Sequence, residues 1–137
     1  MNLSKINKLH ELLTIALDDL KKCEADPTYI INMHEWHVPR GEQCSICLAG
    51  AVMAQSLGAY PSEHRSLFSY DAPLDERLEA LDDLRCGGIV DACHTMGIPS
   101  RWEEHKTSRI DVPDYNDKEH WWQAMGEVLR FLKEWDL

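Results

Sequence analysis

The sequence has no apolar run long enough to cross a membrane and no apolar segment at its N-terminus. Its longest nearly unbroken apolar stretch, Ile46–Ala54, is far shorter than the ~20 residues that a membrane-spanning helix needs. Met1–His10 is polar and lacks the hydrophobic region of a secretory signal peptide. We therefore expect a cytoplasmic protein that binds no membrane and keeps its five cysteines reduced.

Positive charge is also scarce. The chain carries 14 Lys and Arg against 24 Asp and Glu, which gives a formal net charge of -10 at pH 7. Because such a balance repels nucleic-acid phosphates, we expect no direct binding of DNA or RNA. The same charge favours solubility and basic protein partners.

Recognisable catalytic motifs are missing. The sequence contains no G-x-S-x-G, no P-loop and no G-x-G-x-x-G. The stretch from His34 to His37 resembles H-E-x-x-H, but its second histidine comes one residue too early. Nothing in the sequence therefore argues for an enzyme, and no cofactor is expected unless zinc is bound.

Apolar residues recur at helical spacing along most of the chain, with no repeat and no linker that would divide it. The pattern places helices at about residues 4–23, 43–57, 72–86, 89–96 and 116–135. Alternating residues near Thr28–Val38 indicate one short strand or hairpin. We expect a single domain spanning residues 1–137 and a mainly α fold, a compact bundle of four to five helices.

Small residues dominate the second of these helices. Gly50, Ala54 and Gly58 recur every four residues, and Gly58 has the position of a C-terminal cap. A helix face with so little side chain allows a neighbouring backbone to approach closely. We therefore predict that this helix lies at the buried centre of the bundle.

Two thiols and two imidazoles stand close together in the sequence. His34, His37, Cys44 and Cys47 form the pattern H-x2-H-x6-C-x2-C, which offers four ligands of the types that zinc prefers. Three interpretations stay open. The four residues bind zinc, or the two cysteines are small buried core residues. Alternatively, Cys44 begins the helix as a thiolate of low pKa, as in a thiol-dependent enzyme.

Acidic and tryptophan residues suggest surfaces for a partner. The candidate interaction residues are Asp75, Glu76, Glu79, Asp82, Asp83, Trp122 and Trp135. The acidic row could dock on a basic surface or imitate a nucleic acid, and it could equally be a solvated helix face. Tryptophan is enriched in interfaces, and Trp135 could also form a homodimer contact.

The segment Cys44-x-x-Cys47-Leu48-Ala49-Gly50-Ala51, followed by the A-L-x-x-L-R-x-G of Ala80–Gly87, resembles small uncharacterised proteins encoded by tailed phages. The resemblance covers about the middle half of the chain and implies an accessory factor in the bacterial cytoplasm. The leading hypothesis is a small acidic non-enzymatic binding protein that modulates a host protein, in anti-defence or host takeover. The alternatives are a zinc-stabilised interaction module, an acidic nucleic-acid mimic and a thiol-dependent enzyme.

Overall fold

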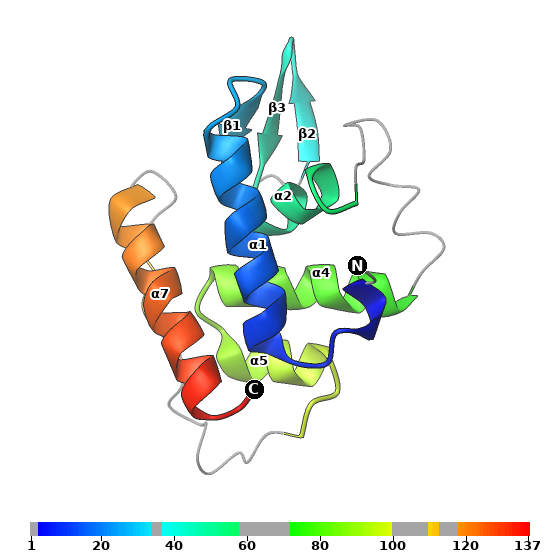
Figure 1. Cartoon of the computed structure of the whole chain (residues 1–137), viewed down its shortest axis with the longest axis vertical. Coiled ribbons are helices and arrows are strands. Elements are labelled where there is room, and N and C mark those ends of the chain that lie inside the picture. The colour runs from blue at the N-terminus through cyan, green and yellow to red at the C-terminus, as the bar shows by residue number, and fades with distance from the viewer. Residues whose placement is uncertain (1–2, 34–36, 58–71, 100–109, 113–117) are drawn as a thin grey trace.

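The computed structural model describes residues 3–33, 37–57, 72–99, 110–112 and 118–137 (Figure 1). Five α-helices, one 3-10 turn and three short strands make up these ranges, which confirms the expected mainly helical fold. In chain order the elements are η1 Leu3–Lys5, α1 Leu9–Glu24, β1 Tyr29–Ile31, β2 His37–Arg40, β3 Gln43–Ile46, α2 Leu48–Ala54, α4 Ala72–Arg85, α5 Ile89–Thr95 and α7 Lys118–Glu134.

Helix α1 contacts α2, α4 and α7 and runs through the middle of the molecule (Figure 1). Its buried face repeats at helical spacing and includes Leu9, Leu13, Ala16 and Leu20. The sequence places the start of this helix at Ser4, but α1 begins at Leu9 after an extended Lys8. Ile6 lies between η1 and α1, and its carbonyl accepts two hydrogen bonds from the guanidinium of Arg77, at 3.0 and 2.8 Å.

The three strands form one sheet in the order β1-β3-β2 at the C-terminal end of α1 (Figure 1). Strand β3 pairs in parallel with β1 and antiparallel with β2. The turn between β2 and β3 contains Gly41 with a φ of 66°, a left-handed conformation that glycine adopts without strain. The expected strand near Thr28–Val38 is confirmed by β1 and by the first part of β2.

The prediction of a helix over Gln43–Leu57 is wrong at its beginning. Gln43–Ile46 forms the central strand β3, and α2 starts only at Leu48. Hydrogen bonding on both sides decides this outcome, because β3 has a partner strand at each edge. The helix that remains is buried as expected, since every residue from Leu48 to Met53 lies in the core. Gly58 lies outside the described residues.

Helices α4, α5 and α7 complete the core. α5 packs on α4, and α7 lies beside α1 (Figure 1). The buried stripe of α7 includes Trp121, Met125, Val128 and Leu132, whereas Trp135 is 38% exposed. In the described parts of the chain, no helix combines the length and the apolar character needed to span a membrane.

Candidate functional site

The two thiols of the C-x-x-C segment are buried and do not share a helical turn. Cys44 lies on β3 and Cys47 is the residue before α2. The Cys44 thiol donates a weak hydrogen bond to the Ser45 carbonyl, with 3.8 Å between Sγ and the oxygen. Burial raises the pKa of Cys47 to about 11, so this thiol is neutral at pH 7.

The surroundings of the two thiols differ. Charge on Cys44 is among the causes that raise the pKa of Cys23, at the end of α1. The pKa of Cys47 is instead raised by the charge of Asp82 and lowered by that of Arg85, both on α4. The groups that interact electrostatically with the two thiols therefore lie on different helices.

The proposed histidine ligands are only partly described. His37 belongs to β2 and pairs in register with Ile46, but its side chain is outside the described part of the structure, as is the whole of His34. Within the described ranges, no three His, Cys, Asp or Glu side chains gather in a way that could hold a metal ion. The zinc interpretation stays a prediction, which elemental analysis of the purified protein can check.

The acidic residues of α4 divide into exposed and partnered groups. Glu76 and Glu79 are exposed, whereas Asp75 is half-buried. Asp82 accepts a hydrogen bond from the Arg85 guanidinium at 2.8 Å.

Asp83 accepts a hydrogen bond at 2.7 Å from the hydroxyl of Thr95 on α5. Burial raises the pKa of Asp83, and the nearby carboxylates of Asp91 and Asp82 raise it further. Asp82 and Asp83 of the predicted acidic row therefore form hydrogen bonds within the protein. Glu76 and Glu79 are the exposed members of the row.

The two candidate tryptophans lie far apart on α7. Trp135 is exposed near the C-terminal end and packs against Phe131, with ring centroids 5.9 Å apart. Trp122 is half-buried near the start of the helix, thirteen positions earlier, which corresponds to about 20 Å along the axis. They cannot form one patch. The homodimer role of Trp135 stays a prediction.

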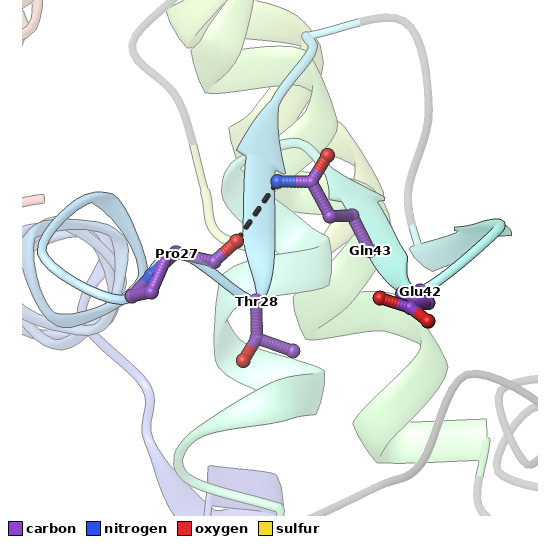
Figure 2. Close-up of a pocket in the computed structure, with 4 residues that line it drawn as sticks. All are labelled: Pro27, Thr28, Glu42 and Gln43. Carbon is purple, nitrogen blue, oxygen red and sulfur yellow. Dashed lines mark hydrogen bonds between the residues drawn. The ribbon is translucent and has the colours of Figure 1, made fainter.

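Several open hollows lie on the surface of the described residues, and three of them bear on function. One is polar and lies at the start of β1 and β3, where Pro27, Thr28, Glu42 and Gln43 line it (Figure 2). In it the Gln43 side-chain amide donates a hydrogen bond to the Pro27 carbonyl at 2.9 Å. The amide is thus occupied within the chain, and it ties β3 to the end of the α1–β1 connection.

A second hollow is acidic and lies along α7, beside the segment 110–112. Asp111, Val112, His120, Gln123, Ala124 and Glu127 line it. The third lies between the C-terminal end of α1 and the start of α7, where Lys21, Glu24, Ala25 and Trp122 line it. We call this third hollow the Trp122 groove.

Sequence reasoning found Trp122 but missed the rest of this groove. The indole Nε1 of Trp122 donates a hydrogen bond to Glu24 at 3.2 Å across 98 positions of sequence. No local pattern connects residues so distant. A buried Asp19 that accepts a hydrogen bond from Ser56 was missed for the same reason.

No family model, no curated protein and no solved structure matches the chain.

Proposed function

We propose that this chain is a small acidic non-enzymatic binding protein, an accessory factor of a tailed phage that binds and modulates a host protein. The observation that carries the proposal is the acidic excess on the described surface. The exposed carboxylates belong to Glu11, Asp18, Glu24, Glu42, Glu76, Glu79, Asp91, Asp111, Glu119, Glu127, Glu134 and Asp136. The exposed lysines and arginines are Lys5, Lys21, Lys22, Arg130 and Lys133. A surface of this sign attracts a basic partner over long range and speeds its association.

The state of the thiols supports binding over thiol chemistry. Burial raises the pKa of Cys23 and of Cys47 to about 11 in each case. Because the thiolate is the nucleophile, groups with such pKa values react poorly at neutral pH.

The exposed pair Glu76 and Glu79 on α4 is the first contact surface to test. Glu76 lies 3.7 Å from the mostly buried guanidinium of Arg77, which also donates to the main-chain carbonyls of Ile6 and Pro73 and to the side-chain oxygen of Asn7. Changing the two glutamates leaves those main-chain bonds in place. The substitutions therefore report on surface charge more than on folding.

A pull-down from bacterial lysate identifies the partner, and titration calorimetry then compares variants. We expect E76K/E79K to weaken binding by about tenfold or more at low salt, with a smaller difference at high salt. The matched control is E11K/E134K, which changes the net charge equally at other exposed sites. Equal affinity of E76K/E79K and the control would contradict the proposed role of the α4 surface.

A further inference from the structure

Strand β1 forms one edge of the sheet, and part of its main chain has no hydrogen-bond partner (Figure 1). The Thr28 carbonyl accepts a hydrogen bond from the Cys44 N–H of β3 at 2.8 Å. Because main-chain groups alternate in direction along a strand, those of Tyr29 and Ile31 point away from β3. The Tyr29 N–H donates to the Asp26 carbonyl at 3.1 Å. Among the described residues, no hydrogen bond reaches the Tyr29 carbonyl or the N–H and carbonyl of Ile31.

The opposite edge of the sheet, β2, carries a proline that opposes pairing with a further strand. Pro39 pairs in register with Cys44, whose N–H is directed to β1. Two residues in register in an antiparallel pair point their main-chain groups either both toward or both away from each other, so the Pro39 nitrogen lies on the outer edge of β2. A proline at this position offers no N–H to an added strand, which is one way in which proteins protect sheet edges. Strand β1 has neither a proline nor a charged residue, and its edge lacks this protection.

The middle side chain of β1 is an exposed isoleucine. Ile30 is 39% exposed, whereas Tyr29 and Ile31 pack against the core. Side chains alternate between the two faces of a strand, so Ile30 lies on the opposite face from these two neighbours. A strand added beyond β1 would place one of its residues directly beside Ile30 and remove apolar surface from water.

We propose that β1 binds an extended basic segment of a partner protein, which adds to the sheet as a further strand beside β1. Such a segment can accept from the Ile31 N–H and donate to the carbonyls of Ile31 and Tyr29, so that every open main-chain group of this edge is paired. A second copy of the chain fits less well. Its own Tyr29 N–H is already bonded to Asp26, so two antiparallel β1 strands with Tyr29 opposite Ile31 would leave both Ile31 carbonyls unpaired. The net charge of -10 on each copy also opposes self-association and favours a basic segment.

This inference rests on the proposed function, because it names the form in which a binding protein would recognise its partner. It shares no residue with the α4 surface of Glu76 and Glu79. The acidic surface accounts for the attraction of a basic partner, and the open edge of β1 accounts for the main-chain hydrogen bonds that hold the partner once it has arrived. The two contacts can therefore fail separately.

The test follows the main-chain amide resonances of the full chain by NMR while the peptide acetyl-Lys-Thr-Val-Thr-Lys-amide is added. With its valine beside Ile30, the two threonines of the peptide lie opposite Tyr29 and Ile31 and form the hydrogen bonds. We expect the Ile31 N–H to shift saturably and to exchange with solvent more slowly as peptide is added. The Ile30 N–H already points into the sheet and should change little. Absence of a saturable change at Ile31 would overturn the proposal.

Two N-methylated forms of the peptide are the matched controls. The valine N–H of the bound peptide points away from β1, so N-methylation of the valine should change the affinity by less than about twofold. N-methylation of both threonines removes donors that face β1 and should weaken binding by about tenfold or more. Equal affinities of the two forms would contradict strand addition. Protection of the Ile31 N–H that grows with protein concentration in the absence of peptide would identify a second copy as the occupant, which also rejects the proposal.

The α4 variant separates this inference from the proposed function. If the peptide fails to bind while E76K/E79K still weakens the host partner more than its control does, only the β1 proposal is wrong. If the peptide pairs with β1 while E76K/E79K and its control behave alike, the role of the α4 surface is wrong and the β1 edge stands.

Discussion

At the scale of single residues, Asp19 is an acid held in the core. This residue is only 3% exposed, and its carboxylate accepts a hydrogen bond from the hydroxyl of Ser56, two residues after α2. Burial raises the pKa of Asp19 above its ordinary value near 3.8, and the bond from Ser56 offsets part of this increase. The ionised form is therefore less stable in the folded protein than in the unfolded chain.

The sign of the resulting pH dependence follows from linkage. Because the folded pKa is the higher one, the unfolded chain releases its proton first as the pH rises. Stability from this group is complete below pH 3.8 and falls as the pH rises through the window up to the folded pKa. We expect Asp19→Asn, which keeps an acceptor for Ser56, to gain stability relative to the natural protein between pH 3.8 and 7.

Urea denaturation across this pH range measures the difference, with Glu11→Gln, a change at an exposed carboxylate of the same helix, as the control. Identical pH profiles of the two variants would show that burial of Asp19 does not affect its titration.

The cysteines offer a second test at this scale. Cys23, Cys47 and Cys93 are fully buried, whereas Cys86 is half-exposed. We expect iodoacetamide to alkylate Cys86 first in the folded protein and to modify Cys47 about a hundredfold more slowly, because a buried neutral thiol is inaccessible and weakly nucleophilic. Mass spectrometry of peptides from timed reactions gives both rates. Rapid labelling of Cys44, which is also buried, would favour the thiol-dependent enzyme that the sequence leaves open, because that hypothesis assigns the low pKa to Cys44.

At the scale of secondary structure, the connection after α4 depends on one glycine. Gly87 has a φ of 77°, and a Cβ atom there would lie 1.9 Å from the carbonyl oxygen of Ile110. The main-chain N–H of Ile110 also donates to the Gly87 carbonyl at 3.2 Å. The close approach brings the segment 110–112 against the end of α4 and leaves no space for a side chain.

Gly97 provides the matched comparison. It has a φ of 63°, but its Cβ direction is open. We expect Gly97→Ala to cost about 1 kcal/mol from backbone strain alone, and Gly87→Ala to cost about 3 kcal/mol or more because the Ile110 carbonyl must also move. Urea denaturation of both variants compares them. Equal costs would mean that the 110–112 segment adjusts freely.

The comparison of α1 and β3 shows what sequence could predict at this scale. The apolar residues of α1, α4, α5 and α7 repeat at helical spacing, and that local signal identifies them. Cys44-Ser45-Ile46 is too short a segment for its residue pattern to distinguish a strand from a helix. Its strand partners Tyr29–Ile31 lie fifteen positions upstream, and this pairing, which no local pattern reveals, decides the outcome.

The candidate surfaces show the same limit. Glu76 and Glu79 were found because their spacing on a predicted helix fixes their exposure. Asp82 bonds to Arg85 and Asp83 bonds to Thr95, and these partners depend on the folded structure around α4. The sequence alone therefore predicted more solvent-exposed carboxylates on this helix than the structure has. Lys21 and Glu24 were missed since α7 brings Trp122 beside them only in the folded chain.

At the scale of the whole molecule, the start of α1 is held by the last residues of the chain. The Leu137 carbonyl accepts a hydrogen bond from the Leu9 N–H, one of the donors that a helix leaves unpaired at its first turn. The Lys8 ammonium lies 2.9 Å from the Asp136 carbonyl and 3.1 Å from its carboxylate. Leu137 itself is only 6% exposed and packs into the core.

We expect Leu137→Ala to lower the free energy of unfolding by about 2 kcal/mol, because it removes a buried side chain at the edge of the core. The exposed Glu134→Ala, three positions earlier, should change it by less than about 0.5 kcal/mol. Chemical denaturation monitored by tryptophan fluorescence gives both values. A loss for Leu137→Ala as small as that for Glu134→Ala would indicate that the C-terminal residues do not stabilise the start of α1.

The bond from Lys8 to Asp136 spans 128 positions, and Arg77 holds the Ile6 carbonyl across 71. During translation, the first residues of α1 would thus leave the ribosome long before Arg77 or Asp136 had been synthesised. The native contacts of this helix start can then form only after Asp136 has been synthesised, and nascent copies would be candidates for chaperone capture until that point.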